Sequence, residues 1–440
     1  MLRLLTTTVA LTLVITGCSV TSTDSPSSDH PTPAGLPSST QPSTAHSSIA
    51  QPTKGTTPSV APLFEIVAGG GTEADAKQAL DAKILGAAWD VEFAPDGTAN
   101  LLINADDHKR LERIRPDGTR TVVPLDQAWR MGTEIAVGPD GSTYVDLWIG
   151  TKKNTIYRIK PDGSREPVID YDTALSGFDG LGNRPTSETT GEPTRKFTAF
   201  TVDTDGRLVF AADVSGAGKA GAVVRRIEAD GTVRTIAGRP ADFTTAAAAK
   251  AATPAAIRPP ADTRALDWTT TAAMHIDELE TQPDGTFTLG IEGVGSSGVD
   301  FSVLAITASG TVNGLAASQL TGSASFGAPV AETPFTREGH IQAIGVISYG
   351  MSAADGLLAV GTTQEPPQDT SQYYNGKYTP GQRAILDKAR GKAIRLIRPD
   401  GSFSTAALGA DFALHGGYLY VVCRDFLANE LVLGRVKIPA

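Results

Sequence analysis

Short apolar segments with polar positions between them recur along most of the chain. They come in pairs, and a turn dipeptide lies between the two members of each pair. Val91-Glu92-Phe93 and Leu101-Leu102-Ile103 stand on either side of Asp96-Gly97. In the same way, segments at residues 111–114 and 121–123 flank Asp117-Gly118. Asp-Gly between such segments favours a tight hairpin, because glycine adopts the positive φ that the turn needs. The pattern therefore predicts successive β-hairpins.

The hairpins come in pairs, and the pairs form an internal repeat that predicts the fold. Two hairpins give four strands per unit, and six units predict an all-β, six-bladed β-propeller. The paired turns are Asp96-Gly97 with Asp117-Gly118, Asp140-Gly141 with Asp162-Gly163, Asp205-Gly206 with Asp230-Gly231, Asp284-Gly285 with Ser309-Gly310, and Asp355-Gly356 with Asp400-Gly401, followed by a last turn at His415-Gly416.

The blade sequences resemble NHL repeats, in which an apolar strand, a basic and polar stretch and an Arg-rich strand precede a second Asp-Gly. Residues 101–114, which read LLINADDHKRLERI, and residues 227–238, which read IEADGTVRTIAG, carry this resemblance. It covers about residues 64–440 and is strongest in the first three units. The resemblance implies an NHL-like six-bladed propeller. Related propellers include lactonases, strictosidine-synthase-like proteins and the peptide-amidating lyase, but no site motif of theirs matches this sequence.

Residues 63–70 are expected to close the ring. Their sequence, LFEIVAGG, resembles the outer strand at residues 233–238, yet it stands before any first strand. The last unit supplies apolar segments at residues 418–422 and 431–438 and then ends without an outer strand. An N-terminal outer strand that joins the last blade leaves no open edge in the ring.

Strand order sorts the connections onto two faces. The hairpin turns lie on one face, called the turn face, and all other connections lie on the opposite face, called the loop face. The long insertions, at about residues 170–195, 239–268, 313–340 and 362–392, all belong to the loop face. Loops gathered on a rigid scaffold often carry binding sites. The candidate binding residues on this face are the aromatic side chains Trp89, Trp129, Trp148, Trp268, Tyr373, Tyr374 and Tyr378.

Each of these aromatic residues also has a structural interpretation. The tryptophans are equally expected to pack between blades or under loops. The tyrosines are followed by Thr379 and Pro380, a favourable helix start. They are therefore also expected to form, with a short helix, a self-packed flap over the channel mouth.

Acidic residues recur where the first strands begin. Alignment on the Asp-Gly turns places Asp90, Glu134 and Glu278 at equivalent positions, and His275 and Asp277 lie just upstream of Glu278. Several carboxylates around one axial mouth suit Ca²⁺, and His275 among them suits Zn²⁺. The alternative is that these are solvated acids at strand starts, because no tight ligand spacing marks a metal site.

The first 62 residues have a different composition from the rest. Residues 1–17 combine Arg3 with a short apolar run, as in a signal peptide. The sequence Ile15-Thr16-Gly17-Cys18 resembles the lipobox of bacterial lipoproteins, which implies acylation of Cys18 and a location on the extracytoplasmic side of the cell membrane. Residues 18–62 are dominated by Ser, Thr and Pro and are expected to form a disordered stalk. The propeller is expected to span residues 63–440.

The charge and the cysteine content of the chain limit the classes of partner that it is expected to bind. The chain has 38 basic and 48 acidic residues, which argues against nucleic acid as a partner of its surface. The only other cysteine, Cys423, is left without a disulfide partner once Cys18 is lipidated. The remaining partners are the membrane, through Cys18, and a protein or small molecule of the cell envelope.

Two functions follow from these features. The first is a lipid-anchored binding propeller that presents its loop face to a ligand or protein in the cell envelope. The second is a metal-dependent lyase or lactonase with its site at the axial mouth. A purely structural envelope protein is a third reading. Metal content is the feature that separates the first two.

Overall fold

The computed structural model describes one propeller unit. The described residues are 63–105, 109–125, 129–149, 154–170, 173–174, 197–216, 219–242, 259–260, 262–271, 274–295, 298–319, 347–354, 356–362, 374, 376–389, 392–397 and 403–438. The signal peptide, Cys18 and the stalk lie outside this set, so their predicted roles stay predictions. In the described part, no helix is long and apolar enough to cross a bilayer.

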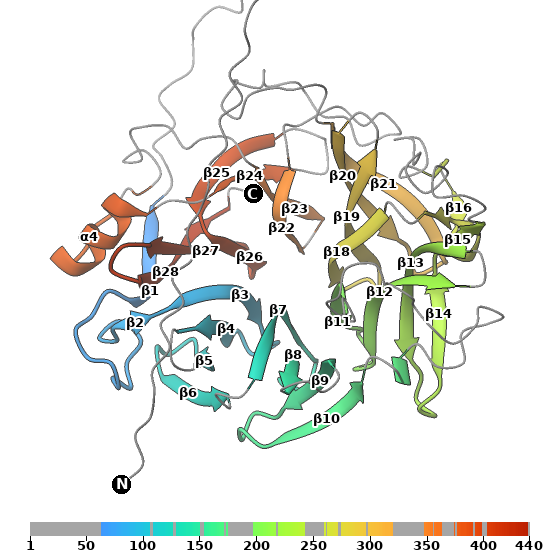
Figure 1. Ribbon diagram of the computed structural model, residues 1–440. Helices are drawn as coiled ribbons and strands as arrows, with labels where there is room; N and C mark the ends of the chain where they lie inside the picture. Colours follow the sequence, from blue (N-terminus) through green and yellow to red (C-terminus); the bar gives the residue numbers. More distant parts are fainter. Residues whose placement is uncertain are drawn as a thin grey trace, which may run out of the picture. The chain divides into compact units, whose positions relative to one another are not determined.

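Six small sheets, antiparallel except for the pair β15 and β17, form a ring, which confirms the predicted six-bladed propeller (Figure 1). Blade 1 contains β3 (Ala87–Phe93), β4 (Ala99–Asn104), β5 (Lys109–Ile114) and β6 (Arg120–Leu125). Blade 2 contains β7 (Trp129–Val137), β8 (Thr143–Ile149), β9 (Asn154–Ile159) and β10 (Arg165–Asp170). Blade 3 contains β11 (Ala199–Val202), β12 (Leu208–Gly216), β13 (Lys219–Ile227) and β14 (Val233–Ala237), with β15 (Arg239–Asp242) and β17 (Thr269–Thr270) beside them.

The other three blades follow the same plan. Blade 4 contains β18 (Met274–Thr281), β19 (Phe287–Gly295), β20 (Gly298–Ile306) and β21 (Thr311–Gln319), flanked by β16 (Thr263–Arg264) and a 3₁₀ turn, η1 (Ala265–Asp267). Blade 5 contains β22 (Ile347–Ala354), β23 (Leu357–Thr362), β24 (Lys392–Ile397) and β25 (Phe403–Gly409). Blade 6 contains β26 (Asp411–His415), β27 (Tyr418–Asp425) and β28 (Glu430–Lys437), completed by β1 (Phe64–Gly69) and β2 (Ile84–Leu85). The strand β21 reaches Gln319, so the third insertion begins later than the sequence suggested.

The repeated turns are formed as the sequence predicts. At Asp117-Gly118, Gly118 N donates to Arg115 O at 2.9 Å, and Arg115 N donates to Thr119 O at 2.9 Å. Gly118 has φ +82°, which a residue with a side chain rarely adopts. Asp117 Oδ1 accepts a hydrogen bond from Thr119 N at 2.8 Å. The aspartate thus fixes the turn that the glycine permits, and the same pair fixes most of the other hairpins.

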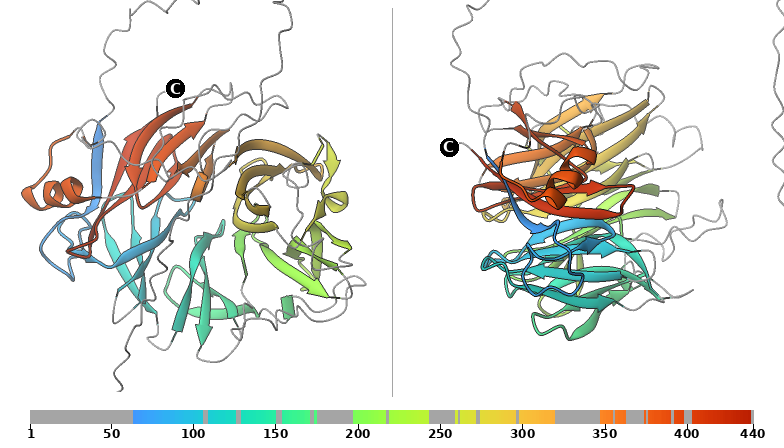
Figure 2. Two further views of the ribbon diagram at one scale, coloured as in Figure 1. Left: turned by 45° about the horizontal axis from the view of Figure 1, so that its top comes forward. Right: turned by 90° about the vertical axis from the view of Figure 1, so that its left-hand side faces the viewer.

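The N-terminal strand closes the ring. Strand β1 pairs antiparallel with β28, with Phe64 opposite Val436 and Gly69 opposite Val432. Residue 63 therefore enters at the turn face, where β28 ends. The strands of every blade run between the two faces, as the side view in Figure 2 shows. Closure replaces an exposed sheet edge with paired backbone.

Arginines of the third strands join neighbouring blades. Arg113 on β5 is buried, and its guanidinium donates to Lys160 O at 2.8 Å and to Pro161 O at 3.0 Å in blade 2. Arg225 on β13 is fully buried and donates to Ala174 O in the connection that precedes its blade. The Arg-rich segments that resemble NHL repeats therefore serve the fold, because each guanidinium satisfies carbonyl groups that strand pairing leaves open.

Candidate functional site

The axis of the ring is lined by the first strand of each blade. Bulges interrupt the pairing of these strands with their neighbours, between Ala88 and Asp90 on β3, and between Ile276 and Glu278 on β18. A bulge turns side chains away from the regular alternation of a strand. In both strands the residue after the bulge is an acid that lines the channel.

Seven carboxylates gather in this axial channel. A cavity of about 340 Å³ on the loop-face side contains them together with Trp89, Thr198, Phe200 and Met351. Among the described residues that line this cavity there is no lysine, arginine or histidine. The seven acids, called the axial carboxylates from here on, are Asp90 and Glu92 on β3, Glu134 on β7, Asp277, Glu278 and Glu280 on β18, and Asp411 on β26.

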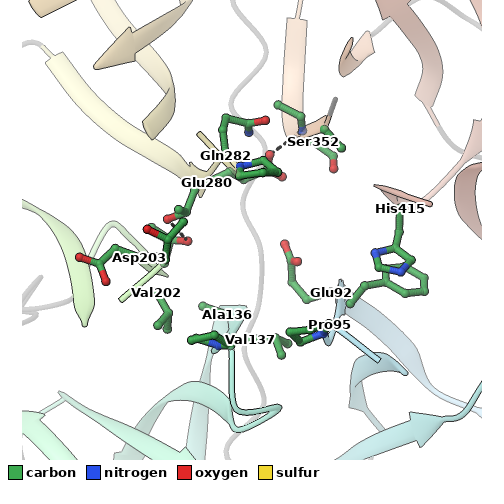
Figure 3. A pocket seen from close by; sticks show the side chains of 18 of the residues that line it. Glu92, Pro95, Ala136, Val137, Val202, Asp203, Glu280, Gln282, Ser352 and His415 are labelled. Carbon is green, nitrogen blue, oxygen red and sulfur yellow. Dashed lines mark hydrogen bonds between the residues drawn. The ribbon is translucent and has the colours of Figure 1, made fainter. Parts of the chain in front are cut away.

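A second cavity, of about 320 Å³, opens toward the turn face. Glu92 and Glu280 line both cavities, so the two chambers meet between these side chains. Figure 3 shows the turn-face chamber, with Glu92 and Glu280 reaching into the opening from different blades. His415 stands at its rim, where its ring stacks on Phe93 with centroids 4.6 Å apart. The channel therefore has an acidic middle and one histidine at its turn-face rim.

Several axial side chains also fasten one blade to the next. Each accepts a hydrogen bond from a backbone N–H on the first strand of the following blade, which satisfies a donor at the unpaired inner edge of that blade. The bonds are Ile135 N to Asp90 Oδ2 at 2.6 Å, Phe200 N to Glu134 Oε2 at 3.2 Å, Ala353 N to Glu280 Oε2 at 2.5 Å, and Leu414 N to Ser352 Oγ at 2.9 Å. These acids are therefore structural ties as well as channel lining.

The environment of the axial carboxylates disfavours their charged forms. Burial, and next the negative charge of Asp411, raise the pKa of Glu92 from 4.5 to about 8. Burial also holds the pKa of Asp90 well above its usual range, with Asp411 and Glu92 adding to the effect. Burial followed by neighbouring carboxylates raises the pKa of Glu134 and of Glu280 in the same way. Like charges close together in a poorly solvated space favour protonation.

The structure brings together four of the five residues that the sequence suggested as metal ligands. Asp90, Glu134, Asp277 and Glu278 line the loop-face cavity, but His275 does not. Its Nδ1 lies 2.7 Å from Asp213 Oδ2 on β12 of blade 3. Within the described ranges, no three His, Cys, Asp or Glu side chains are grouped to hold a metal ion. The residues as arranged thus do not fit a ready metal centre, and metal binding stays a prediction.

The predicted aromatic binding surface is only partly formed. Trp89 is half-buried and lines the cavity beside Asp90. Trp268 is 1% exposed and packs in the core between blades 3 and 4, so its assignment to a binding surface is wrong. Trp129 and Trp148 occupy the adjoining ends of β7 and β8, and their side chains lie outside the described part.

The tyrosine segment packs against the closing strand and not over the channel. Tyr374 is 3% exposed and donates to Leu408 O at 2.9 Å, and Tyr378 donates to Phe64 O at 3.0 Å. The assignment of Tyr374 to an exposed contact surface is therefore wrong, whereas Tyr378 is half-buried and its assignment stays a prediction. The helix α4 (Pro380–Lys388) was correctly predicted, and it lies beside β1 at the rim of the ring (Figure 1). Tyr373 lies outside the described residues.

Sequence reasoning missed Glu92, Glu280 and Asp411. Side chains two residues apart in a strand share a face. Since Asp90 and Glu278 were already candidates, this alternation pointed to Glu92 and Glu280. Asp411 opens β26, the first strand of blade 6, but the weak repeat there gave no Asp-Gly turn from which to align it.

Comparison with known proteins adds nothing about the site. No family model and no curated protein sequence matches the chain. A catalytically inactive virginiamycin B lyase from Staphylococcus aureus with quinupristin is 12% identical, with a TM-score of 0.38 over 82% of this chain and 97% of that one. The polysaccharide lyase Uly1 is 9% identical, with a TM-score of 0.36 over 87% and 98%. TolB from Acinetobacter baumannii is 13% identical, with a TM-score of 0.36 over 78% and 64%. Likeness at this level carries no argument about activity.

Proposed function

We propose that the chain is a lipid-anchored binding protein of the cell envelope, and that its ligand carries a positive charge into the axial channel. The observation that supports this proposal is the convergence of seven carboxylates on one cavity in the described part of the chain. Carboxylates crowded in a poorly solvated channel repel one another, and a cation that enters the channel relieves that repulsion.

Trp89 adds to the case for a cation. Its indole lines the loop-face cavity next to Asp90, and Lys109 Nζ already lies 5.9 Å from the centre of its ring. Aromatic faces attract cations, most strongly where water is excluded. A metal ion uses only the carboxylates, whereas an organic amine uses the indole as well. The effect of substituting Trp89 on binding therefore distinguishes an organic amine from a metal ion.

The anchor supplies location and orientation in this proposal. The lipobox at residues 15–18 places acyl chains on Cys18, and residues 19–62 link them to the propeller. Because residue 63 lies at the turn face, the stalk joins the propeller on that face. Cys18→Ala should release the protein from membranes. Membrane retention of that variant in a cell-fractionation experiment contradicts the anchor.

Equilibrium binding to the full-length protein in detergent tests the channel. Calorimetric titrations with CaCl₂ and with spermidine serve as the two probes. The double variant Glu134→Gln/Glu278→Gln should weaken binding of the active probe by about tenfold or more, because a charge-assisted contact contributes about 1.5–3 kcal/mol. The exposed acid Asp75 gives the matched control, Asp75→Asn, which should bind normally. Absence of binding by both probes, or equal binding by the double variant, contradicts the proposal.

The same titration separates the binding protein from the alternative of a metal-dependent lyase or lactonase. The alternative needs a metal, and binding of Ca²⁺ without spermidine favours it. Binding of spermidine that Trp89→Ala weakens favours the binding protein, because only an organic cation uses the indole. No observation in the described part of the chain favours the alternative at present.

A further inference from the structure

The closing strand β1 is held by a segment that comes from another blade. Between β23 and β24 of blade 5 the chain leaves its sheet, and Tyr374 with residues 376–389 crosses to the outer edge of blade 6. Both views in Figure 2 show α4 beside β1. This segment is called the strap from here on. Its contacts with β1 join residues that are 314 positions apart in the sequence.

The strap contacts β1 through side chain and backbone. The Phe64 ring is 1% exposed and meets the ring of Tyr374 edge to face, with centroids 5.2 Å apart. Tyr378 Oη donates to Phe64 O at 3.0 Å, and Phe64 is the first residue of β1. This carbonyl lies at the outer edge of the sheet, where an unpaired group invites pairing with another chain. The strap therefore covers the edge that ring closure leaves exposed.

The helix of the strap is built to dock. Thr379 and Gln382 form a capping box that fixes the first turn of α4. Gln382, Ile385 and Leu386 are buried, and Ile385 and Leu386 join the core of blades 5 and 6. At the far end, Lys388 Nζ lies 3.2 Å from Asp425 Oδ2 on β27. The helix is thus tied to blade 6 at both ends.

Two glycines permit the close approach of the strap to the end of β1. A Cβ on Gly381 would lie 2.7 Å from Gly70 O, and a Cβ on Gly70 would lie 2.5 Å from Gln382 Cγ. Both distances are shorter than real contacts, so any larger residue at Gly381 pushes the strap away from Gly70. The close contact between Gly70 and the start of α4 therefore depends on the absence of a side chain at Gly70 and at Gly381.

By contrast, the pairing of β1 with the rest of blade 6 is short. Five residues of β1 pair with β28, and the register shifts between Ile66 and Ala68. Sheet pairing of this length, at an edge and interrupted by a bulge, is among the first parts of a fold to open. The junction of β1 and β28, called the seam from here on, therefore relies on the strap.

We propose that the strap controls the seam of the ring. While it is seated, β1 stays paired with β28. When it is displaced, β1 and the stalk attached to it separate from blade 6 while blades 1–5 remain folded. This inference does not depend on the channel ligand, and its failure leaves the proposed function untouched.

The chain carries its own reporter of seam opening. Cys423 on β27 is 0% exposed, and its Sγ lies 3.7 Å from Tyr374 Oη beneath the strap. Burial raises the pKa of this thiol to about 12, so a seated strap keeps it unreactive. Modification of Cys423 by a thiol reagent, followed by mass spectrometry of its peptide, therefore measures how often the strap lifts.

Two variants test the proposal in the full-length protein. One removes a hydrogen bond of the strap, and the other adds a side chain where the strap contacts Gly70. Tyr378→Phe removes the hydrogen bond to Phe64 O. Gly381→Ala favours the isolated helix, because alanine is the better helix former, but it pushes the helix away from Gly70. Both should speed labelling of Cys423 by about 3- to 10-fold, the change that one lost hydrogen bond produces. The matched control is Tyr144→Phe, a buried tyrosine on β8 of blade 2 and away from the seam, and it should label at the normal rate.

Hydrogen exchange decides whether the effect is confined to the seam. In both variants, amides of β1 and β28 should exchange faster, while those of blades 2–4 exchange as in the unaltered protein. Unchanged Cys423 labelling in Tyr378→Phe and Gly381→Ala overturns the proposal. An equal rise in exchange in every blade also overturns it, because the ring then opens only as a whole.

Discussion

Blade 1 buries two glutamates in opposite ways. Glu112 on β5 is 0% exposed and lies between two arginines, with Arg110 Nε at 2.7 Å and Arg120 Nε at 2.7 Å. Glu92 on β3 faces the channel, where its charged neighbours are other carboxylates. In the first arrangement the protein itself supplies the positive charge that pairs with Glu112. The second gathers like charges, which is why the proposed ligand is placed in the channel.

The arginines around Glu112 are themselves fully used. Arg110 Nη2 donates to Leu85 O at 2.7 Å, and Arg120 Nη1 donates to Ala74 O at 2.9 Å. The ion pairs therefore fix the chain between β1 and β3 to the face of blade 1. Such a buried network is a structural device, and breaking it should cost far more than altering the channel.

The largest expected effect is that of Glu112→Gln. It leaves Arg110 and Arg120 buried without a carboxylate, so the free energy of unfolding should fall by about 3–5 kcal/mol in urea denaturation. The matched control is Glu166→Gln, an exposed acid whose Oε2 lies 2.9 Å from Lys160 Nζ. That variant should unfold at nearly the same urea concentration as the unaltered protein, because solvent screens an exposed ion pair. Equal stability of the two variants contradicts the structural role of Glu112.

The next effect is a dependence of stability on pH that originates in the channel. The folded protein holds a proton on Glu92 up to about pH 8, whereas the unfolded chain releases it near 4.5. This contribution is therefore fully present below pH 4.5 and is lost as the pH rises through 8. The melting temperature should fall steadily between pH 5 and pH 9. A melting temperature that is constant or rises over this range contradicts the raised pKa.

A smaller change is expected for Glu92→Gln, since glutamine resembles the protonated acid. The variant should be more stable than the unaltered protein at pH 9, by about 1 kcal/mol or more, because each unit of pKa difference contributes about 1.4 kcal/mol. Near pH 5 the two proteins should have similar stability. Thermal unfolding at the two pH values checks both expectations. If the variant is less stable than the unaltered protein at pH 9, Glu92 does not experience the proposed repulsion.

The sequence predicted the fold because the relevant information is local. Each Asp-Gly turn depends on one glycine and one aspartate within a few residues, as at Asp117-Gly118, and the repeat multiplied this signal. The closing role of residues 63–70 followed from counting strands, and the pairing of Phe64 with Val436 confirms it. These features needed no knowledge of contacts between distant side chains.

The candidate site was less accessible from sequence because it depends on distant contacts. Asp90, Glu134 and Glu278 were found through their fixed distance from a turn. The burial of Trp268 and Tyr374 depends on packing between blades, which no local pattern encodes. The same is true of His275, which faces Asp213 of the neighbouring blade and not the acids of its own strand.

The central claim is that the axial channel crowds carboxylates together, so that Glu92 holds a proton at neutral pH. Infrared spectroscopy of the carbonyl stretch of protonated carboxylic acids tests it most directly, in the ligand-free protein and in Glu92→Gln. The account predicts a protonated-carboxyl band that persists at pH 7, weakens as the pH rises through 8 and is smaller in Glu92→Gln. Complete ionisation of all carboxyl groups by pH 6 would contradict it.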